Sequence, residues 1–282
     1  MSSTLAIVLS FHPSKYIVRN IETLLMEVSH VVVVDNESSE DSKRILSYFS
    51  KERVTCIFNA TNNGVAKGFN QGIKWGLEKN FDYFLLMDQD SRPVPNMVMK
   101  LKVVLESHLQ QQRQLVLVGP QHEDYIRKLT TITENVDPTP LLITSGSLMS
   151  KGVIDVVGLY DERLFIDHVD HDYCLRLKKM GGQCLKVNSA ILLHKFGEAR
   201  VKKIFGKTFF LQEYSPFRRY YMMRNRIILY KRYGMFKEKW FWLDLKNALK
   251  DFVKLVVFEK QKRAKIFAIF RGVFDGIFWV DA

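Results

Sequence analysis

The sequence predicts an α/β protein built on a mostly parallel sheet, because strand-like and helix-like patterns alternate through its first 120 residues. Short apolar runs of the kind that form buried strands occur at 5–9, 31–34, 54–58 and 83–87. Amphipathic stretches lie between these runs. Strands that alternate with helices in this way are usually parallel and joined by right-handed crossovers.

The helices expected in this region cover residues 15–28, 39–49 and 66–79. The pattern beyond residue 120 is less regular. It predicts strands at 115–118, 141–143, 185–187 and 190–193, a loop or hairpin at 121–139, a helix over 167–180, and further helices from about residue 205.

The composition is that of a globular protein with reduced cysteines. Apolar residues make up 47% of the 282 positions, and no apolar run is long enough to cross a membrane. The N-terminus has the pattern of a first strand rather than of a signal peptide. Cys56, Cys174 and Cys184 form no Cys-x-x-Cys pair. Free thiols in a reducing compartment are therefore expected, and a zinc site is not.

The net charge of +12 comes entirely from the C-terminal part of the chain. Residues 1–200 carry 23 basic and 23 acidic side chains, whereas residues 201–282 carry 19 and 7. The C-terminal part also holds 20 of the 35 aromatic residues. We therefore expect a neutral globular domain over 1–200 and a basic, aromatic-rich segment over 201–282.

Asp88 and Asp90 directly follow the apolar run at 83–87, and they are the first indication of chemistry. Ligands of open α/β sheets bind outside the carboxyl ends of the strands. Two carboxylates at such a place repel each other unless a cation lies nearby, and Mg²⁺ is commonly held by one or two carboxylates together with substrate phosphates. The alternative is a solvated turn, in which aspartate is common.

Three further polar segments favour the same interpretation. Asp35 ends a strand, where it can bind a base or ribose or serve only as a turn residue. Residues 63–72 form a glycine-rich loop that runs into a helix, suited to phosphate or to close packing. Residues 167–176 place three aspartates and two histidines at a helix start, more than capping requires.

Taken in order, these motifs resemble a known enzyme family. The matching segments are Val33-Val34-Asp35-Asn36, Asn63-Gly64 with Gly68, Asn70 and Gly72, Asp88-Gln89-Asp90-Ser91, Thr144-Ser145-Gly146-Ser147, Phe165-Ile166-Asp167, Asp170 to Arg176, His194, and Tyr221 to Arg226. Together they resemble the inverting nucleotide-sugar glycosyltransferases of family two, and in particular their bacterial rhamnosyltransferase branch. The resemblance covers most of the chain.

The resemblance implies a type A glycosyltransferase fold, with a Rossmann-like, mostly parallel central sheet, followed by a helical basic segment. Asp35 would hold the pyrimidine base, and Asp90 would ligate Mg²⁺ or Mn²⁺ together with Asp88 and His194. The metal would offset the charge of the leaving diphosphate. His194 is otherwise a histidine at a strand end. The donor contacts implied are Ser10, Phe11, Asp35, Asn63, Gly68, Asn70, Asp88 and Gln89.

Inversion at the anomeric carbon needs one base to take the proton of the acceptor hydroxyl. Asp170 aligns with the catalytic aspartate of the family, although Val169 replaces the usual glutamate. Asp172 is the second candidate, and it could instead pair with Arg176 four residues later. The acceptor contacts implied are Ser145, Gly146, Asp167 and His168.

The C-terminal segment has the pattern of basic amphipathic helices. Lys246, Lys250 and Lys254 are expected on one face. The opposite face is expected to carry Trp242, Leu245, Leu249, Phe252, Val253 and Val256, and the apolar pattern continues with Phe267, Phe270, Phe274, Ile277 and Phe278. Such helices bind anionic membrane interfaces or pack on the catalytic domain or a second subunit.

We expect a peripheral enzyme on the inner face of the bacterial cytoplasmic membrane that moves L-rhamnose from dTDP-rhamnose to a lipid-linked cell-surface polysaccharide. The same fold with a UDP-hexose donor is the alternative within this class. A nucleic-acid-binding module and an inert structural subunit are alternatives from other classes. The neutral first domain and its acidic site residues argue against a nucleic-acid partner.

Overall fold

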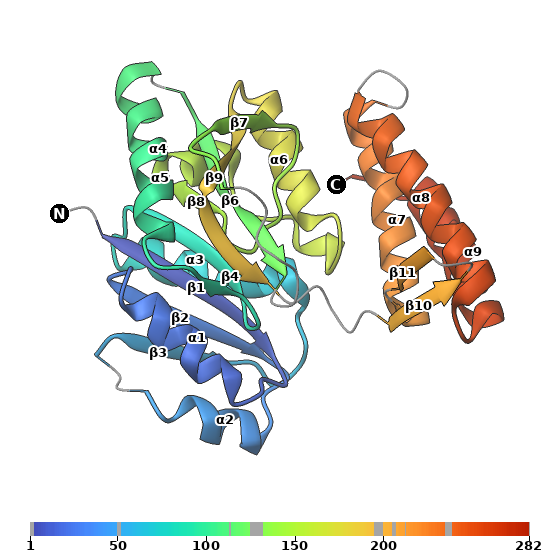
Figure 1. Ribbon diagram of the computed structural model, residues 1–282, viewed down its shortest axis with the longest axis horizontal. Coiled ribbons are helices and arrows are strands. Elements are labelled where there is room, and N and C mark those ends of the chain that lie inside the picture. Colours follow the sequence, from blue (N-terminus) through green and yellow to red (C-terminus); the bar gives the residue numbers. More distant parts are fainter. Residues whose placement is uncertain are drawn as a thin grey trace. The chain divides into compact units, whose positions relative to one another are not determined.

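The chain forms two compact units in the computed structural model (Figure 1). Unit 1 comprises Met1–Phe165 and Val169–Lys195, and unit 2 comprises Ile166–His168 and Phe196–Ala282. Residues 166–168 and 196–200 of the segment 1–200 therefore group with the C-terminal unit. The structure describes residues 3–49, 52–112, 114–124, 132–194, 200–204, 207–211, 213–234 and 239–281.

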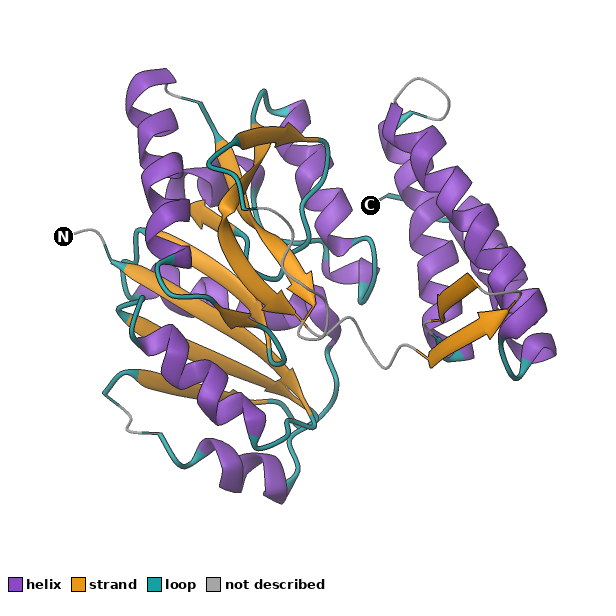
Figure 2. Cartoon of the chain, in the orientation of Figure 1, coloured by secondary structure: helices purple, strands orange, loops and turns teal. Residues whose placement is uncertain are grey.

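Unit 1 is organised around a mixed sheet, drawn as orange arrows in Figure 2, whose strand order is β3-β2-β1-β4-β8-β6-β9-β5, with β7 paired to β9. The strands β3, β2, β1 and β4 are mutually parallel, and β6 is parallel to β9, whereas β8, β5 and β7 run antiparallel to their neighbours. The bounds are β1 Thr4–Phe11, β2 His30–Asn36, β3 Val54–Phe58, β4 Tyr83–Asp88, β5 Arg92–Pro93, β6 Val116–Asp124, β7 Val136–Thr139, β8 Leu148–Ser150 and β9 Gln183–His194.

The register of the parallel strands brings their polar ends together. Ser10 of β1 lies beside Asp35 of β2, and Leu9 lies beside Asp88 of β4. The apolar residues before these positions are fully buried. The carboxyl ends of β1, β2 and β4 therefore form one edge, with two aspartates on it.

Helices cover both faces of this sheet. Side chains of α1, α2 and α4 join one core with Ala6 and Val8, whereas α3 packs on the face that carries Leu5, Ile7 and Leu9. Because side chains alternate across a strand, β1 serves both layers. The bounds are α1 Tyr16–Leu25, α2 Glu40–Leu46, α3 Gly64–Glu78, α4 Met97–Gln112, α5 Lys151–Val157 and α6 Val169–Lys179, with a short 3₁₀ helix at Glu162–Leu164.

A row of glycines lets α3 approach β1 closely. A Cβ atom at Gly68, Gly72 or Gly76 would overlap a side chain of β1. The side chains concerned are Leu9, Ile7 and Leu5, respectively. Glycines four residues apart lie on one face of a helix, so this face packs directly on the strand. The small-residue alternative for this segment therefore explains Gly68 and Gly72.

The second half of the sheet differs from the sequence-based expectation. The apolar run at 141–143 forms no strand, because Leu142 packs over Gly119 and its amide donates to Cys174 Sγ at 3.4 Å. The two short strands expected at 185–187 and 190–193 are one strand, β9. Its register against β6 shifts at Pro120, which has no amide hydrogen to donate. Part of the stretch at 121–139, expected as a loop or hairpin, is strand, in β6 and β7.

Unit 2 is a helical unit with one hairpin. It contains α7 Pro216–Tyr233, α8 Lys239–Phe258 and α9 Lys262–Ile277, preceded by β10 Arg200–Ile204 and β11 Lys207–Leu211. The expectation of helices from about residue 205 was therefore wrong for 207–211. Gly272 and Gly276 of α9 lie against the backbone of α7, where a side chain would not fit. Within the described residues, no helix is long and apolar enough to cross a membrane.

The exposed face of α8 corrects one expectation about the lysines. Lys246, Lys250 and Lys254 line the same shallow groove as Trp242, Leu249 and Val253, so they flank the apolar stripe instead of opposing it. Residues three or four apart are neighbours on a helix, which places Lys246 between Trp242 and Leu249. The apolar stripe itself is exposed.

The glycine row predicts a local packing defect when a branched side chain is introduced. We expect Gly72→Val to lower the free energy of unfolding by about 1–3 kcal/mol, because Ile7 is fully buried and cannot move aside. Chemical denaturation monitored by circular dichroism measures this change. Gly152→Ala in α5 is the control, since its Cβ would meet only Ser150 Oγ at 3.7 Å. Equal stability of both variants and the parent protein would contradict the close approach.

Candidate active site

Asp88, Asp90 and His194 form a cluster at the carboxyl edge of the sheet. Each offers one ligand atom, and these atoms all lie within 4.8 Å of one another. Asp88 ends β4, Asp90 follows in the turn, and His194 ends β9. The short strand β5 pairs Arg92 with Leu193 and so holds the turn beside the histidine. Carboxylate oxygens and an imidazole nitrogen form a suitable donor set for Mn²⁺ or Mg²⁺.

Two buried serines lie beneath this cluster. Ser91 Oγ lies 2.7 Å from His194 Nδ1 and 2.8 Å from Ser145 Oγ. Ser145 Oγ in turn accepts the backbone amide of Asp88 at 3.1 Å. Both serines are fully buried, so protein groups supply the hydrogen bonds in this place. Ser145, which was expected to contact the acceptor, instead has its hydroxyl in this network.

Burial lowers the pKa of both histidines of this region. The pKa of His122 is lowered to about 4, mainly by its burial, and its Nε2 lies 2.8 Å from Ser145 O. The pKa of His194 is lowered by burial, against the opposing effect of the Asp90 and Asp124 carboxylates. Their rings meet edge to face at 5.9 Å between centroids. A neutral imidazole is the form that ligates a metal.

Asp35 lies fully buried beside Ser10. The Ser10 hydroxyl donates to Asp35 Oδ1, whereas Oδ2 has no hydrogen-bond partner among the described residues. Burial and the Asp35 carboxylate together raise the pKa of the Cys56 thiol to about 11. A buried carboxylate oxygen without a donor is costly, so a ligand N–H at this position would be bound favourably.

Gln89 connects two strand ends at the edge. Its side chain accepts the amide of Phe11 and donates to the Phe11 carbonyl, each at 3.0 Å. Asn20 Nδ2 donates to the Gln89 carbonyl at 2.9 Å. The side chain of Phe11 is 42% exposed to solvent. Gln89 is thus engaged with the backbone, while the Phe11 ring is open to a ligand.

The loop before α3 is held by Asn36. The side-chain oxygen Oδ1 of Asn36 accepts a hydrogen bond from the backbone amide of Asn63. The side-chain nitrogen Nδ2 of Asn36 donates to the backbone carbonyl of Gly64 at 3.1 Å. Gly64 has a φ of 81°, which favours glycine. Asn36 follows Asp35 at the end of β2, so its bond to Asn63 places Asn63 at the same edge as Asp35.

Two residues expected to bind the donor are engaged elsewhere. Asn70 is buried and exchanges hydrogen bonds of 2.9 Å with the backbone of Tyr160. Gly68 packs under Leu9, as described above. Both residues hold α3 in place.

The first turn of α6 separates the two candidate bases. Asp170 is partly exposed, and its Oδ1 accepts the amide of His171 at 2.9 Å. Asp172 is fully buried and bonds Arg176 Nε at 2.9 Å, while Arg176 also donates to the Val157 carbonyl. A base must reach a substrate hydroxyl. The geometry therefore favours Asp170 and makes Asp172 part of a structural ion pair.

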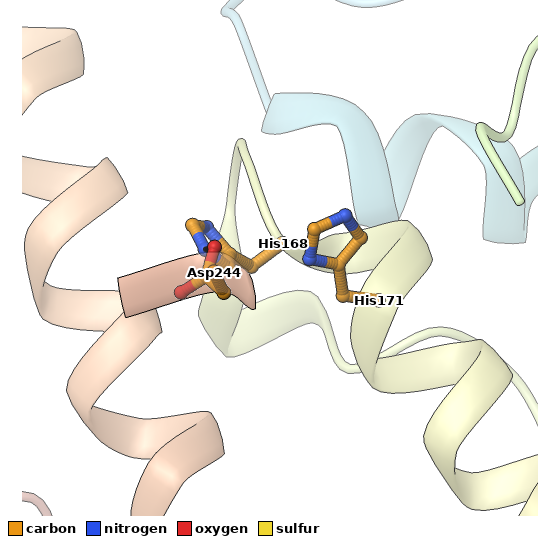
Figure 3. A group of neighbouring side chains, drawn as sticks. All are labelled: His168, His171 and Asp244. Carbon is orange, nitrogen blue, oxygen red and sulfur yellow. Dashed lines mark ion pairs between the residues drawn. The ribbon is translucent and has the colours of Figure 1, made fainter. Parts of the chain in front are cut away.

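Asp167 and His168 belong to unit 2. Asp167 accepts hydrogen bonds from Arg218, and Asn225 Nδ2 donates to the Asp167 carbonyl at 2.9 Å. Asp167 and His168 each have a φ of 61°, which is uncommon for residues other than glycine. His168 Nε2 lies 3.9 Å from Asp244 (Figure 3). These contacts lie within unit 2 and hold its residues Asp167 and His168 in place.

Gly146 completes the loop between β7 and β8. Its φ is 85°, and a Cβ there would overlap Pro120 and Leu192. Its amide donates to the Leu86 carbonyl at 2.7 Å. The Thr-Ser-Gly-Ser segment therefore serves first to support β4.

No pattern in the sequence indicated the structural roles of Ser91 and His122, and Gln89 was expected to contact the donor. Ser91 was noted only as the end of the Asp-Gln-Asp-Ser motif. Its partner His194 is 103 residues away along the chain. No local pattern reports such a contact, because it depends on the pairing of β5 with β9.

Comparisons with known proteins agree with this geometry. The chain is 30% identical to dTDP-rhamnosyl transferase RfbF of Shigella flexneri over 247 residues, which is 82% of this chain and 81% of that protein. It is 22% identical to the low-salt glycan biosynthesis hexosyltransferase Agl10 of Haloferax volcanii, over 80% of this chain and 77% of that one.

The fold also matches solved glycosyltransferase structures. The crystal structure of GalNAc-T7 with UDP, GalNAc and Mn²⁺ superposes with a TM-score of 0.63 at 13% identity. The superposition includes 88% of this chain, and this chain spans about half, 51%, of the length of the GalNAc-T7 chain. The profile of glycosyl transferase family 2 matches residues 6–148, the part that carries Asp35, Asp88 and Asp90. The protein is therefore a glycosyltransferase of family 2 with a type A glycosyltransferase fold.

Proposed function

We propose that this enzyme transfers L-rhamnose from dTDP-rhamnose, with inversion and with the help of a divalent metal, to a lipid-linked cell-surface polysaccharide. The proposal rests above all on the placement of Asp35, Asp88 and Asp90 along one sheet edge, where a nucleoside diphosphate can lie across the strand ends. The similarity to a dTDP-rhamnosyl transferase supports the choice of donor.

The nucleoside is held at the ends of β1 and β2. Asp35 Oδ2 accepts the N–H of a pyrimidine, and Ser10 keeps the other oxygen of the carboxylate in place. The exposed Phe11 ring packs on the base, and Asn63 lies at the same edge through its bond to Asn36. These contacts bind thymine and uracil alike, because both carry the same N3–H.

The diphosphate is placed beside Asp88, Asp90 and His194. Mg²⁺ or Mn²⁺ bound by these three residues would supply positive charge to the diphosphate as it leaves. Asp90 is the exposed member and reaches outward, whereas Asp88 and His194 are partly buried. The residues fix the leaving group without themselves touching the anomeric carbon.

Asp170 takes the proton from the acceptor hydroxyl. Its carboxylate is partly exposed at the start of α6, where it can reach a substrate hydroxyl. The bond from the acceptor oxygen to the anomeric carbon forms as the bond to the diphosphate breaks, and the proton passes to Asp170. A single displacement of this kind inverts the anomeric carbon.

Donor choice is tested by hydrolysis of nucleotide sugars in the presence of Mn²⁺. We expect dTDP-rhamnose to be hydrolysed faster than dTDP-glucose, UDP-glucose and UDP-galactose, because the proposed enzyme binds this donor productively. Release of nucleoside diphosphate measures the rate. A clear preference for a UDP-hexose would replace the rhamnose proposal with the hexosyltransferase alternative.

The Asp90→Ala variant tests the metal site. It should lose the part of donor binding that depends on Mn²⁺.

The role of Asp170 is tested by separating binding from transfer. We expect Asp170→Asn to bind dTDP with unchanged affinity and to lose transfer by roughly 10²–10⁴-fold, the usual contribution of a general base. Calorimetry and product formation measure the two effects. Asp155→Asn on α5 is the matched control, since Asp155 forms an exposed pair with Lys151. Turnover by Asp170→Asn at the rate of the parent protein would contradict the assignment of Asp170 as the general base.

The C-terminal helices provide a surface for an anionic lipid bilayer at the inner face of the cytoplasmic membrane. Leu249 and Val253 of α8 are about 60% exposed, and Phe267, Phe270 and Phe274 form an exposed stripe on α9. Lys250 and Arg271 lie beside these stripes. Apolar side chains flanked by basic ones suit a negatively charged interface, where a lipid-linked acceptor is also found.

Vesicle binding tests this surface. We expect the double variant Leu249→Ser/Phe270→Ser to bind vesicles that contain phosphatidylglycerol at least about tenfold more weakly. Each change removes an exposed apolar side chain that would become buried when the helix enters the interface. Sedimentation with vesicles measures the affinity. Met99→Ser/Val156→Ser in unit 1 removes equally exposed apolar groups and is the control. Unchanged vesicle binding with loss of a dimer in size-exclusion chromatography would show that these stripes join two subunits instead.

A further inference from the structure

A groove of about 540 Å³ lies between α7 and α9, within unit 2. Its volume is in the range of small-molecule sites, about 300–1,000 Å³. Most of its lining is aromatic or alanine, from Phe217, Tyr220 and Tyr221 of α7 and Ala264, Phe267 and Ala268 of α9. Phe217 is 56% exposed and Phe267 is 71% exposed, so the aromatic walls are open to a ligand.

Small residues on one face of α9 make room for this groove. Gly272 and Gly276 lie against the backbone of α7, where a side chain would not fit. Ala268 and Ala264 precede them in steps of four residues and so fall on the same face of the helix. Two alanines in this row leave space between the rings of α7 and Phe267, which gives the groove its apolar interior.

The polar groups at the Arg271 end of the groove are already paired. The Tyr220 hydroxyl donates to Asp275 Oδ2 at 2.7 Å, and Arg271 Nε lies 3.7 Å from the same oxygen. The Arg271 guanidinium also lies over the Tyr220 ring. Because the carboxylate offsets the charge of Arg271, this end suits a hydrocarbon chain better than an anion.

The other end of the groove meets a basic turn, formed by Lys260, Lys262 and Arg263. Ala264 lines both the groove and the shallow hollow beside this turn. All three basic side chains are exposed, and none of them forms an ion pair with another described residue. The apolar groove therefore leads directly to a group of three cations.

The carboxylates beside the basic turn do not offset its charge, because other cations hold them. Lys265 is buried, and its Nζ lies 3.2 Å from Glu213 Oε1 and 2.8 Å from Glu259 Oε2. Arg219 pairs with the remaining oxygen of Glu259. The three cations of the turn are thus available to an anion from outside the chain.

We propose that the α7–α9 groove binds a single-chain lipid diphosphate, with the diphosphate on the basic turn and the hydrocarbon chain between the two helices. The inference rests on the proposed function, in which the acceptor is lipid-linked, and it names the part of that acceptor which unit 2 holds. Charge complementarity supports this occupant, since three cations match a polyvalent head group. A phospholipid such as phosphatidylglycerol brings one negative charge and two chains, whereas the groove is a single channel.

Calorimetry on the full-length protein tests whether head and chain bind together. We expect geranylgeranyl diphosphate, below the concentration at which it forms micelles, to bind at least about tenfold more tightly than inorganic pyrophosphate or geranylgeraniol, because only the whole molecule uses both ends of the site. Equal affinity for geranylgeranyl diphosphate and pyrophosphate would overturn the proposal. Binding to phosphatidylglycerol vesicles without binding of geranylgeranyl diphosphate would show that a bilayer covers this surface instead.

Two variants separate the ends of the site. Ala268→Trp fills the groove, so we expect it to weaken binding of geranylgeranyl diphosphate at least about tenfold and to leave pyrophosphate binding unchanged. Val253→Trp, on the exposed face of α8, is the matched control. Lys262→Glu/Arg263→Glu should weaken binding of both ligands. Its control, Lys246→Glu/Lys250→Glu, makes the same charge change beside the other apolar stripe and should weaken neither. Equal losses in a variant and its control would overturn the assignment to this groove.

The groove and the proposed function fail separately. A protein that hydrolyses dTDP-rhamnose but binds no geranylgeranyl diphosphate would overturn the groove and leave the proposed donor in place. A protein that binds geranylgeranyl diphosphate as expected but hydrolyses no nucleotide sugar would support the groove and contradict the proposed transfer.

Discussion

Parallel pairing of β1 with β2 and β4 is the constraint on which the rest of the site depends. It sets Ser10 beside Asp35 and Leu9 beside Asp88, so that polar residues distant in sequence end at one edge. The buried apolar residues before them hold the register, because a slip by one residue would turn every core side chain to the other face. The glycine row of α3 keeps one helix close to β1 and brings its N-terminal loop to the same edge.

This arrangement places negative charge where a nucleoside diphosphate and a metal can offset it. Asp35 is buried with one oxygen satisfied by Ser10, and Asp88 and Asp90 lie together beside His194. Around them, neighbouring side chains are occupied with holding the backbone: Gln89 ties Phe11, and Asn36 ties the loop at Gly64. These hydrogen bonds hold the strand ends in a defined arrangement, which lowers the cost of ordering them when a ligand binds.

Several site residues predicted from motifs turned out to support the site from within. Asn70 and Gly68 fix α3, Ser145 holds the Asp88 amide, and Asp172 pairs with Arg176. A motif marks a position at which the residue type matters, but a buried partner and a substrate impose similar demands. Only burial and hydrogen-bond partners distinguish the two, and neither can be read from the order of residues.

The α/β class, the parallel half of the sheet and the carboxylates at its strand ends could all be predicted from the residues alone, because they follow from local apolar runs and the polar residues that end them. Prediction from the residues failed at 141–143 and 185–193, where Leu142 packs without pairing and β9 continues through a shift in register. Only the tertiary structure decided that His194 meets Ser91 and that Asp170, rather than Asp172, is accessible. The reason is that both facts depend on contacts between elements, and on burial, which no local pattern of residues contains.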